Sequence, residues 1–367
     1  MPELRHTPLH ERHVALGASF TDFGGWDMPV RYTSDLAEHR AVREAAGLFD
    51  ISHMAEFLVT GSGAGAFLDY ALAGRLSTLA VGKAKYSLVL AEDGGIVDDV
   101  IVYRTGEERF LVIANAGNRD AVAEAFAERA VRGATVEDVT DQFVLIAVQG
   151  PRAEQILGET AGLAASDLPG LGYYAWRDGT FGDATVFIAR TGYTGEDGFE
   201  LLIPNAQAGA LWDALLAAGE PHGLVPAGLA ARDTLRLEAG MPLYGHELGR
   251  DIAPAQSGLE RVVATTKDEF VGKAGLEARD LGGARVLVGL SAEGRRAGRA
   301  GYRVLGPGGA EVGEITSGAL SPTLGHPIAL AFVAPEFAAP GTALSIDVRG
   351  TGIPATVTTL PFYRRTK

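Results

Sequence analysis

The sequence predicts an α+β protein with a separate all-β domain at its C-terminal end. Segments with strand and helix patterns alternate up to about residue 240, which is typical of an α+β body. From about residue 280, short apolar runs are broken by glycine and proline, as in Gly306–Gly309, which is typical of a small barrel or sandwich. Residues 1–266 hold 20 basic and 37 acidic side chains, a net charge of −17, whereas residues 267–367 hold 12 and 9, a net charge of +3. This step in charge supports the boundary, and 367 residues suit two or three domains.

The first long element is expected to be a helix that Asp35 caps. Glu38 stands three residues after Asp35, which is the spacing of a capping box, and Gly47 is expected to end the helix. Residues 56–60 then predict a strand, and an apolar helix follows it.

The glycines between that strand and helix are compatible with two interpretations, a nucleotide-binding turn and a glycine-rich helix start. The pattern Gly61-x-Gly63-x-x-Ala66 has the layout of a dinucleotide-binding turn. The acidic residue required about 20 positions later is missing, because residues 75–91 contain no Asp or Glu. We therefore favour a glycine-rich helix start over a nucleotide site.

A β-hairpin is expected next, with strands at 86–90 and 96–103 joined by the turn Glu92-Asp93-Gly94-Gly95. The elements expected after it are a strand at 110–115, a helix at 118–130, two strand–helix units up to about residue 220 with Pro151 as a first helical residue, and a charged helix at 226–239.

The second hairpin strand carries two adjacent carboxylates. Side chains alternate between the faces of a strand, so Asp98 shares a face with Val100, and Asp99 shares the other face with Ile101. Whichever face is core, one carboxylate lies among apolar neighbours, which is costly unless it is paired or used. It either holds a cationic or amine-bearing ligand, or bonds to local backbone at a sheet edge.

The segment 190–200 places three glycines at three-residue spacing between two strand-like runs. Tyr193 is displayed on this loop, and Glu200 enters the following strand. An aromatic ring with a carboxylate suits a flat heterocycle that carries an amidine-like N–H edge. A long hairpin loop without a ligand remains the alternative.

The predicted helix at 226–239 carries Arg232 and Arg236, which are four residues apart and therefore share a face. Such a pair can clamp carboxylates or orient an acidic side chain of a site. A solvated face with local ion pairs, for example to Asp233, is the alternative.

Composition excludes several classes of function. The chain has no cysteine, which removes disulfides, thiolate metal sites, iron–sulfur clusters and a cysteine nucleophile. A net charge of −14 argues against general nucleic-acid binding. We expect a cytoplasmic protein with no membrane contact, because no long uncharged apolar segment and no signal-peptide core occur. No metal motif is present, and the lone His53 suits a structural role better than a catalytic one.

Together these segments resemble the aminomethyltransferases, or T-proteins, of the glycine cleavage system. The resemblance runs in order along essentially the whole chain, and its most specific blocks are residues 190–200 and 231–240. The other matching stretches are Thr7–Leu9, Phe23–Val30, Ala46–Met54, Gly82–Ser87, Gly94–Val102, Gln149–Pro151 and Ser317–Gly325.

The resemblance implies an α+β, three-domain, cloverleaf-like folate-binding body with a C-terminal β-barrel domain. The domains are expected at residues 1–50 with 142–275, at 51–141, and at 280–367. Tetrahydrofolate is expected in a central channel as a co-substrate, without a metal. The implied partner is the lipoylated H-protein of the same system.

The resemblance also assigns roles to single residues. The first aspartate of the Gly-Gly-Ile-Val-Asp-Asp run, Asp98, is the expected catalytic carboxylate. The expected folate-binding residues are Tyr86, Asp98, Val100, Tyr193, Glu200, Arg232 and Arg365. A tail residue lines the site in relatives, and the choice between Tyr363 and Arg365 stays open.

The implied reaction transfers the methylene carbon of an aminomethyl group on the lipoyl arm to tetrahydrofolate. N5 of the folate attacks this carbon, ammonia and the dihydrolipoyl arm leave, and 5,10-methylenetetrahydrofolate forms. A carboxylate in a dry cleft stabilises the developing cationic charge by about 3–4 kcal/mol. The alternatives are a related folate-dependent demethylase and a non-catalytic folate-binding module. The iron–sulfur-assembly relatives carry a Lys-Gly-Cys signature, which the absence of cysteine excludes.

Overall fold

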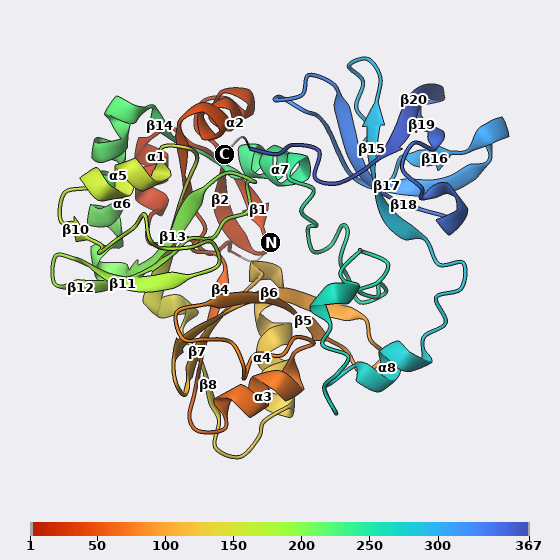
Figure 1. Ribbon diagram of the computed structural model, residues 1–367. Helices are drawn as coiled ribbons and strands as arrows, with labels where there is room; N and C mark the ends of the chain where they lie inside the picture. The colour runs from red at the N-terminus through yellow and green to blue at the C-terminus, as the bar shows by residue number, and fades with distance from the viewer. Residues whose placement is uncertain (1–2, 366–367) are drawn as a thin grey trace.

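Two β-sheets and a closed β-barrel lie around a common centre in the computed structural model (Figure 1). The structure describes residues 3–365. A two-stranded hairpin, β1 (Ser19–Phe23) and β2 (Trp26–Arg31), lies close to this centre. Among the described residues, no helix is both long and apolar enough to cross a membrane.

The five-stranded sheet contains the predicted hairpin and is antiparallel throughout, in the order β5-β6-β7-β4-β8. Its strands are β4 (Ala55–Thr60), β5 (Ala84–Leu90), β6 (Ile96–Gly106), β7 (Arg109–Ala114) and β8 (Thr135–Asp138). Helices α3 (Ala64–Ala71) and α4 (Arg119–Glu128) cover one face, where Phe57, Phe67 and Phe126 pack edge to face. The strands and helix predicted for this region are confirmed to within a few residues.

The seven-stranded sheet combines two separate parts of the chain, in the order β10-β11-β12-β13-β9-β3-β14. Its strands are β3 (Ala46–Asp50), β9 (Phe143–Gln149), β10 (Leu163–Ala164), β11 (Trp176–Phe181), β12 (Ala184–Ala189), β13 (Gly198–Pro204) and β14 (Leu224–Pro226). Only the pair β14–β3 is parallel. Strand β3 comes before the five-stranded sheet in sequence but pairs with β9, which comes after it. We therefore propose residues 1–50 with 142–275 as one domain, 51–141 as a second and 280–367 as a third.

Helices cover both faces of this sheet. On one face, α1 (His10–Ala15), α5 (Ala153–Glu159) and α6 (Asn205–Gly219) pack over a core that includes Trp212. On the other face lie α2 (Asp35–Glu44) and α7 (Leu229–Glu238), which contribute Val42 and Leu235. The same core contains Tyr103 and Leu111 of the five-stranded sheet, so the two sheets pack against each other here.

The C-terminal strands close into a six-stranded barrel, which decides between the two architectures that the sequence allowed. The strands are β15 (Val286–Ala292), β16 (Arg303–Leu305), β17 (Glu311–Leu320), β18 (Pro327–Val333), β19 (Ala343–Val348) and β20 (Thr351–Thr358). A short helix, α8 (Lys273–Ala278), precedes the barrel and lies beside the five-stranded sheet (Figure 1). Closure leaves no open sheet edge in the barrel.

Three expected helix boundaries differ from the structure. Ser34, and not Asp35, caps α2, because its hydroxyl accepts a hydrogen bond from the backbone of Ala37 at 3.1 Å. Gly47 does not end α2. It lies in β3, where a Cβ atom would come within 2.5 Å of Val42, so the strand needs glycine to approach the helix. Pro151 stands two residues before α5 and is not its first residue.

The glycines at 61 and 63 open α3 without forming a phosphate cradle. The backbone N–H of Gly63 already donates to the carbonyl of Gly133 at 2.9 Å. A Cβ atom on Gly61 would lie 2.3 Å from that same carbonyl oxygen. The favoured interpretation as a glycine-rich helix start is therefore confirmed.

Candidate functional site

A cavity of about 620 Å³ lies between the two sheets and α7. Its wall comes from the β1–β2 hairpin, the turn after β3, strands of both sheets, α7 and the segment 241–246, and the barrel contributes none of the lining residues. Of the expected site residues, the cavity is lined by Tyr86, Val100, Tyr193, Glu200 and Arg232, but not by Asp98 or Arg365.

Asp98 and Asp99 lie on opposite faces of β6, as the alternation predicted. Asp98 is fully buried on the face that α3 and α4 cover. Its carboxylate accepts hydrogen bonds from the backbone N–H of Asn115 at 3.0 Å, from Nδ2 of Asn115 at 2.8 Å and from Nδ2 of Asn118 at 2.6 Å. Asp99 lines the cavity. Asp99 is therefore the carboxylate of the pair that faces the cavity, whereas Asp98, to which the resemblance pointed, lies on the opposite face of the strand.

Asp99 has partners of its own at the cavity wall. The hydroxyl of Tyr86 donates to its Oδ2 at 3.1 Å, and Nδ2 of Asn115 donates to its Oδ1 at 2.8 Å. Burial raises the pKa of both aspartates, and the charge of Asp99 raises the pKa of Asp98 further. The pair therefore binds a proton more readily than two exposed aspartates do.

Glu200 stands on β13, at the end of the glycine-rich loop, as the sequence indicated. Its Oε2 accepts hydrogen bonds from the hydroxyls of Thr191 at 2.5 Å and Tyr103 at 3.4 Å. Tyr193 lies in the loop, and its hydroxyl donates to the carbonyl of Pro242. Both side chains are thus fixed by the protein before any ligand arrives.

Arg232 and Arg236 share a face of α7 but differ sharply in their partners. Arg236 is buried and fully bonded: Nη1 lies 3.1 Å from Glu247 and Nη2 lies 2.8 Å from the hydroxyl of Ser317 in the barrel. The guanidinium of Arg232 makes no hydrogen bond or ion pair with any residue that the structure describes, and its Nη1 is buried away from solvent. Its guanidinium lies 5.0 Å from the centre of the Tyr193 ring. Enclosure lowers the pKa of Arg232, and an unpaired cation in the cavity wall indicates a missing polar partner.

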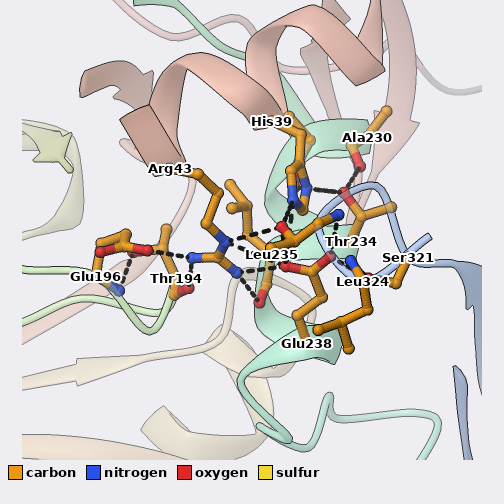
Figure 2. Close-up of polar contacts among 12 residues, drawn as sticks. His39, Arg43, Thr194, Glu196, Ala230, Thr234, Leu235, Glu238, Ser321 and Leu324 are labelled. Carbon is orange, nitrogen blue, oxygen red and sulfur yellow. Dashed lines mark hydrogen bonds and ion pairs between the residues drawn. The ribbon is translucent and has the colours of Figure 1, made fainter. Parts of the chain in front are cut away.

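A second polar network holds the parts around the cavity together (Figure 2). Arg43 of α2 donates to Glu238 of α7 at 2.8 Å, to Glu196 at 2.9 Å and to the carbonyl of Thr194 at 2.7 Å. Because Thr194 and Glu196 stand one and three residues after Tyr193, Arg43 connects the glycine-rich loop to α7.

Glu238 extends this network into the barrel. Its carboxylate accepts hydrogen bonds from the backbone N–H of Thr323 at 3.0 Å and from Ser321, both in the loop between β17 and β18. His39 lies 3.2 Å from the same carboxylate. Burial alone raises the pKa of Glu238, but His39, Ser321 and Arg43 lower it to about 2. These hydrogen bonds attach the barrel to α7, the helix that lines the cavity.

The C-terminal tail approaches the glycine-rich loop without lining the cavity. Arg365 is 40% exposed at its side chain and lies 3.4 Å from Asp197. The ring of Tyr363 stacks on the guanidinium of Arg43 at 4.1 Å, and its backbone N–H donates to the backbone carbonyl of Glu238. Of the two tail residues that the sequence left open, Tyr363 thus contacts the network of Arg43 and Glu238, whereas Arg365 contacts the glycine-rich loop at Asp197.

Sequence reasoning missed several residues of the site. Asn115 connects both aspartates, yet its only signal was a polar residue just after a strand. The hydroxyls of Tyr103 and Thr191 donate hydrogen bonds to Glu200, and the spacing of these residues in the sequence did not predict that contact. His53, interpreted as structural, lines the cavity.

One group of potential metal ligands occurs in the described part of the chain, formed by His6, His10 and Asp27. The two imidazoles are stacked 3.7 Å apart at an angle of 4°, so their nitrogen lone pairs run parallel and do not converge on one point. None of the three residues lines the cavity.

The cavity therefore combines aromatic walls, an unpaired guanidinium and four acidic residues, of which Asp99 and Glu200 stand on strands of the two sheets. Asp99 and Glu200 accept hydrogen bonds, and Arg232 donates them. This set suits a flat, polar heterocycle with donors and acceptors on its edge.

Comparisons with known proteins agree with this arrangement. Residues 9–267 match the family model described as "GCVT N-terminal domain", and residues 285–364 match the "Glycine cleavage T-protein C-terminal barrel domain". A protein named aminomethyltransferase from Saccharopolyspora erythraea is 55% identical, with 100% of both chains covered. One of the same name from Chlorobaculum tepidum is 44% identical over 98% of each chain.

A solved structure is similar over nearly the whole chain. The crystal structure of glycine cleavage system aminomethyltransferase T from Bartonella henselae is 38% identical, with a TM-score of 0.91, and 99% of this chain and 100% of that chain are covered.

Proposed function

Because the chain belongs to the glycine cleavage T-protein family and is an aminomethyltransferase of the glycine cleavage system, we propose its substrates and partner in detail. The aminomethyl group arrives on the lipoyl arm of H-protein, and its methylene carbon passes to tetrahydrofolate. Ammonia, 5,10-methylenetetrahydrofolate and dihydrolipoyl H-protein are the products. No metal takes part in this proposal, and the location is the cytoplasm.

The unpaired guanidinium of Arg232 is the observation that carries the folate proposal. Arg232 lies in the cavity wall and has no hydrogen-bond partner among the described residues. A polar ligand stabilises such a cation because it replaces the hydrogen bonds to water that burial removes. Folate offers such groups on its pterin ring, and Tyr193 and Glu200 supply an aromatic face and an acceptor beside it. The residues present therefore fit the group.

Asp99 is the carboxylate that we assign to the reacting centre, in place of Asp98. Tetrahydrofolate supplies the nucleophilic nitrogen when it is bound. Asp99 faces the cavity, fixed by Tyr86 and Asn115, so its charge is oriented before positive charge develops there. A preorganised carboxylate of this kind is worth about 3–4 kcal/mol, or roughly 10²–10³ in rate. Asp98, on the opposite face of the strand, accepts a hydrogen bond from the same Asn115 side chain and so helps to position it.

Arg43 and Glu238 do not line the cavity, but they position elements that do. They hold the loop that carries Tyr193 against the helix that carries Arg232. Precise placement of both side chains matters, because a misplacement of about 1 Å can cost about 10²-fold in rate.

Ammonia release from aminomethyl-loaded, lipoylated H-protein tests this proposal. We expect ammonia and 5,10-methylenetetrahydrofolate in equal amounts, and neither product at a catalysed rate when tetrahydrofolate or the aminomethyl load is left out. Folate binding without ammonia release would support the non-catalytic folate-binding alternative. Failure of the protein to bind tetrahydrofolate at all would overturn the assignment of the cavity.

A further inference from the structure

We propose that His53 is a further specificity-determining residue of the cavity, whose Nε2–H donates a hydrogen bond to the ring carbonyl oxygen of bound folate. The inference rests on the proposed function and assigns a ligand contact to a side chain that the reaction described above does not use.

His53 lies in the turn between β3 and β4 and lines the cavity although only 3% of it is exposed. The ring of Phe23, on the β1–β2 hairpin, meets the imidazole edge to face at 5.4 Å. The imidazole is therefore held in the wall and is screened from bulk water.

Neither ring nitrogen of His53 has a hydrogen-bond partner among residues 3–365, and Nδ1 is sealed from solvent as well. Buried polar side-chain atoms in folded proteins are nearly always bonded, so an unbonded imidazole in a cavity wall points to a ligand. Nε2 is the nitrogen left to face the cavity.

The ring is neutral and its proton is on Nε2. Burial, together with the nearby charge of Arg232 and against the opposing charge of Asp50, lowers the pKa of His53 to about 4. An orphaned buried N–H costs more than an unused lone pair, so the sealed Nδ1 carries the lone pair. A neutral imidazole with its N–H toward the cavity positions a ligand and does not serve as a general acid at neutral pH.

The acceptor follows from the other groups of the wall. Asp99 and Glu200 accept hydrogen bonds and suit the amino and N–H groups of a pterin ring. Arg232 and His53 are donors and need an acceptor, and the ring carbonyl is the single exocyclic oxygen of a pterin. We therefore assign to His53 the selection of ligands that carry a carbonyl group at this ring position over ligands that carry an amino group there.

Calorimetric titration of the full chain with tetrahydrofolate and with its 4-amino counterpart, in which an amino donor replaces the carbonyl, tests the assignment. For His53→Phe, we expect tetrahydrofolate to bind about tenfold more weakly and the 4-amino compound to bind within twofold of its wild-type affinity. His53→Gln, which keeps an N–H donor, should recover most of the lost affinity. The unchanged 4-amino affinity also shows that the variant cavity is folded.

His222→Phe is the matched control, because this histidine pairs with Glu159 at the surface and does not line the cavity. Tetrahydrofolate affinity of His53→Phe within twofold of wild type overturns the inference, and so does an equal loss for both compounds. A wild-type chain that binds neither compound overturns the proposed function itself, and the inference with it.

Discussion

Asp98 and Asp99 share one hydrogen-bond donor: Nδ2 of Asn115 lies 2.8 Å from an oxygen of each carboxylate. The two side chains leave β6 in opposite directions, and the amide of Asn115 reaches both from the end of β7. The buried aspartate is thus coupled to the cavity-facing one through a single side chain.

Replacement of the cavity-facing carboxylate should affect the chemical step most. We expect Asp99→Asn to lower kcat by about 10²-fold or more, because the preorganised negative charge is lost while the shape of the side chain is kept. Ammonia release at saturating substrates measures this, and thermal unfolding should show an intact fold. A kcat within threefold of wild type would remove Asp99 from the reacting centre.

Asp98→Asn is the matched comparison on the opposite face of the strand. Its amide cannot accept all three hydrogen bonds from Asn115 and Asn118, so we expect a loss of about 1–3 kcal/mol in the free energy of unfolding. The effect on kcat should be smaller than that of Asp99→Asn. The reverse order of the two kcat values would restore the role that the sequence assigned to Asp98.

The two arginines of α7 should separate binding from stability. Arg232→Ala should weaken tetrahydrofolate binding by about 10-fold or more and leave the free energy of unfolding nearly unchanged, since this guanidinium has no protein partner to lose. Arg236→Ala should destabilise the fold by about 3–5 kcal/mol, because it leaves Glu247 buried without its partner. Equilibrium titration and urea unfolding distinguish the two, and equal effects of both variants on unfolding would contradict the contrast.

Glu238 should make the stability of the protein depend on pH in the acid range. Its pKa is lowered in the folded state to about 2 from an ordinary value of 4.5, so its stabilisation is present above pH 4.5 and is lost as the pH falls toward 2. A shift of this size corresponds to about 3 kcal/mol. Urea unfolding of wild type and Glu238→Gln should therefore differ most at neutral pH and converge near pH 2. A difference that stays constant with pH would show that the carboxylate charge is not responsible.

The tail residue Arg365 provides a test of the remaining sequence-based assignment. It is largely exposed and pairs with Asp197, so we expect Arg365→Ala to change tetrahydrofolate affinity by less than about twofold. Tyr363→Ala removes the ring that stacks on Arg43 and should therefore have a larger effect than Arg365→Ala on the KM for tetrahydrofolate. A tenfold loss of affinity in Arg365→Ala would return this arginine to the binding site.

The patterns that depend on local geometry were readable from the sequence, whereas contacts over long distances were not. The hairpin around Gly94, the alternation of Asp98 and Asp99, and the all-β C-terminal domain follow from periodicity and turn chemistry. The meeting of Arg43 with Glu238 brings together side chains 195 positions apart, which no spacing rule anticipates. The cap of α2 differs by one residue because the hydroxyl of Ser34 accepts the backbone hydrogen bond of Ala37, and Glu38, expected to complete a box with Asp35, instead accepts a hydrogen bond from the distant Gly228.

The different hydrogen-bond partners of the two arginines on α7 could not be predicted from the sequence pattern either. Helical spacing placed Arg232 and Arg236 on one face and gave no reason to separate them. The difference arises because Ser317 of the barrel and Glu247 reach only Arg236. The resemblance pointed to Arg232, and the structure distinguishes it from Arg236 by a guanidinium without a hydrogen-bond partner among the described residues.

The pairing of β3 with β9 has a consequence for the order of assembly during synthesis. The chain leaves the larger sheet after β3, completes the whole five-stranded sheet, and only then supplies the neighbour that β3 requires. The inserted part begins and ends on adjacent strands, roughly 5 Å apart, so it can close as a unit while the ribosome still holds the remainder. The cavity is finished later still, after α7 and the segment 241–246 have emerged, so its wall is incomplete on the nascent chain until about two thirds of it has been made.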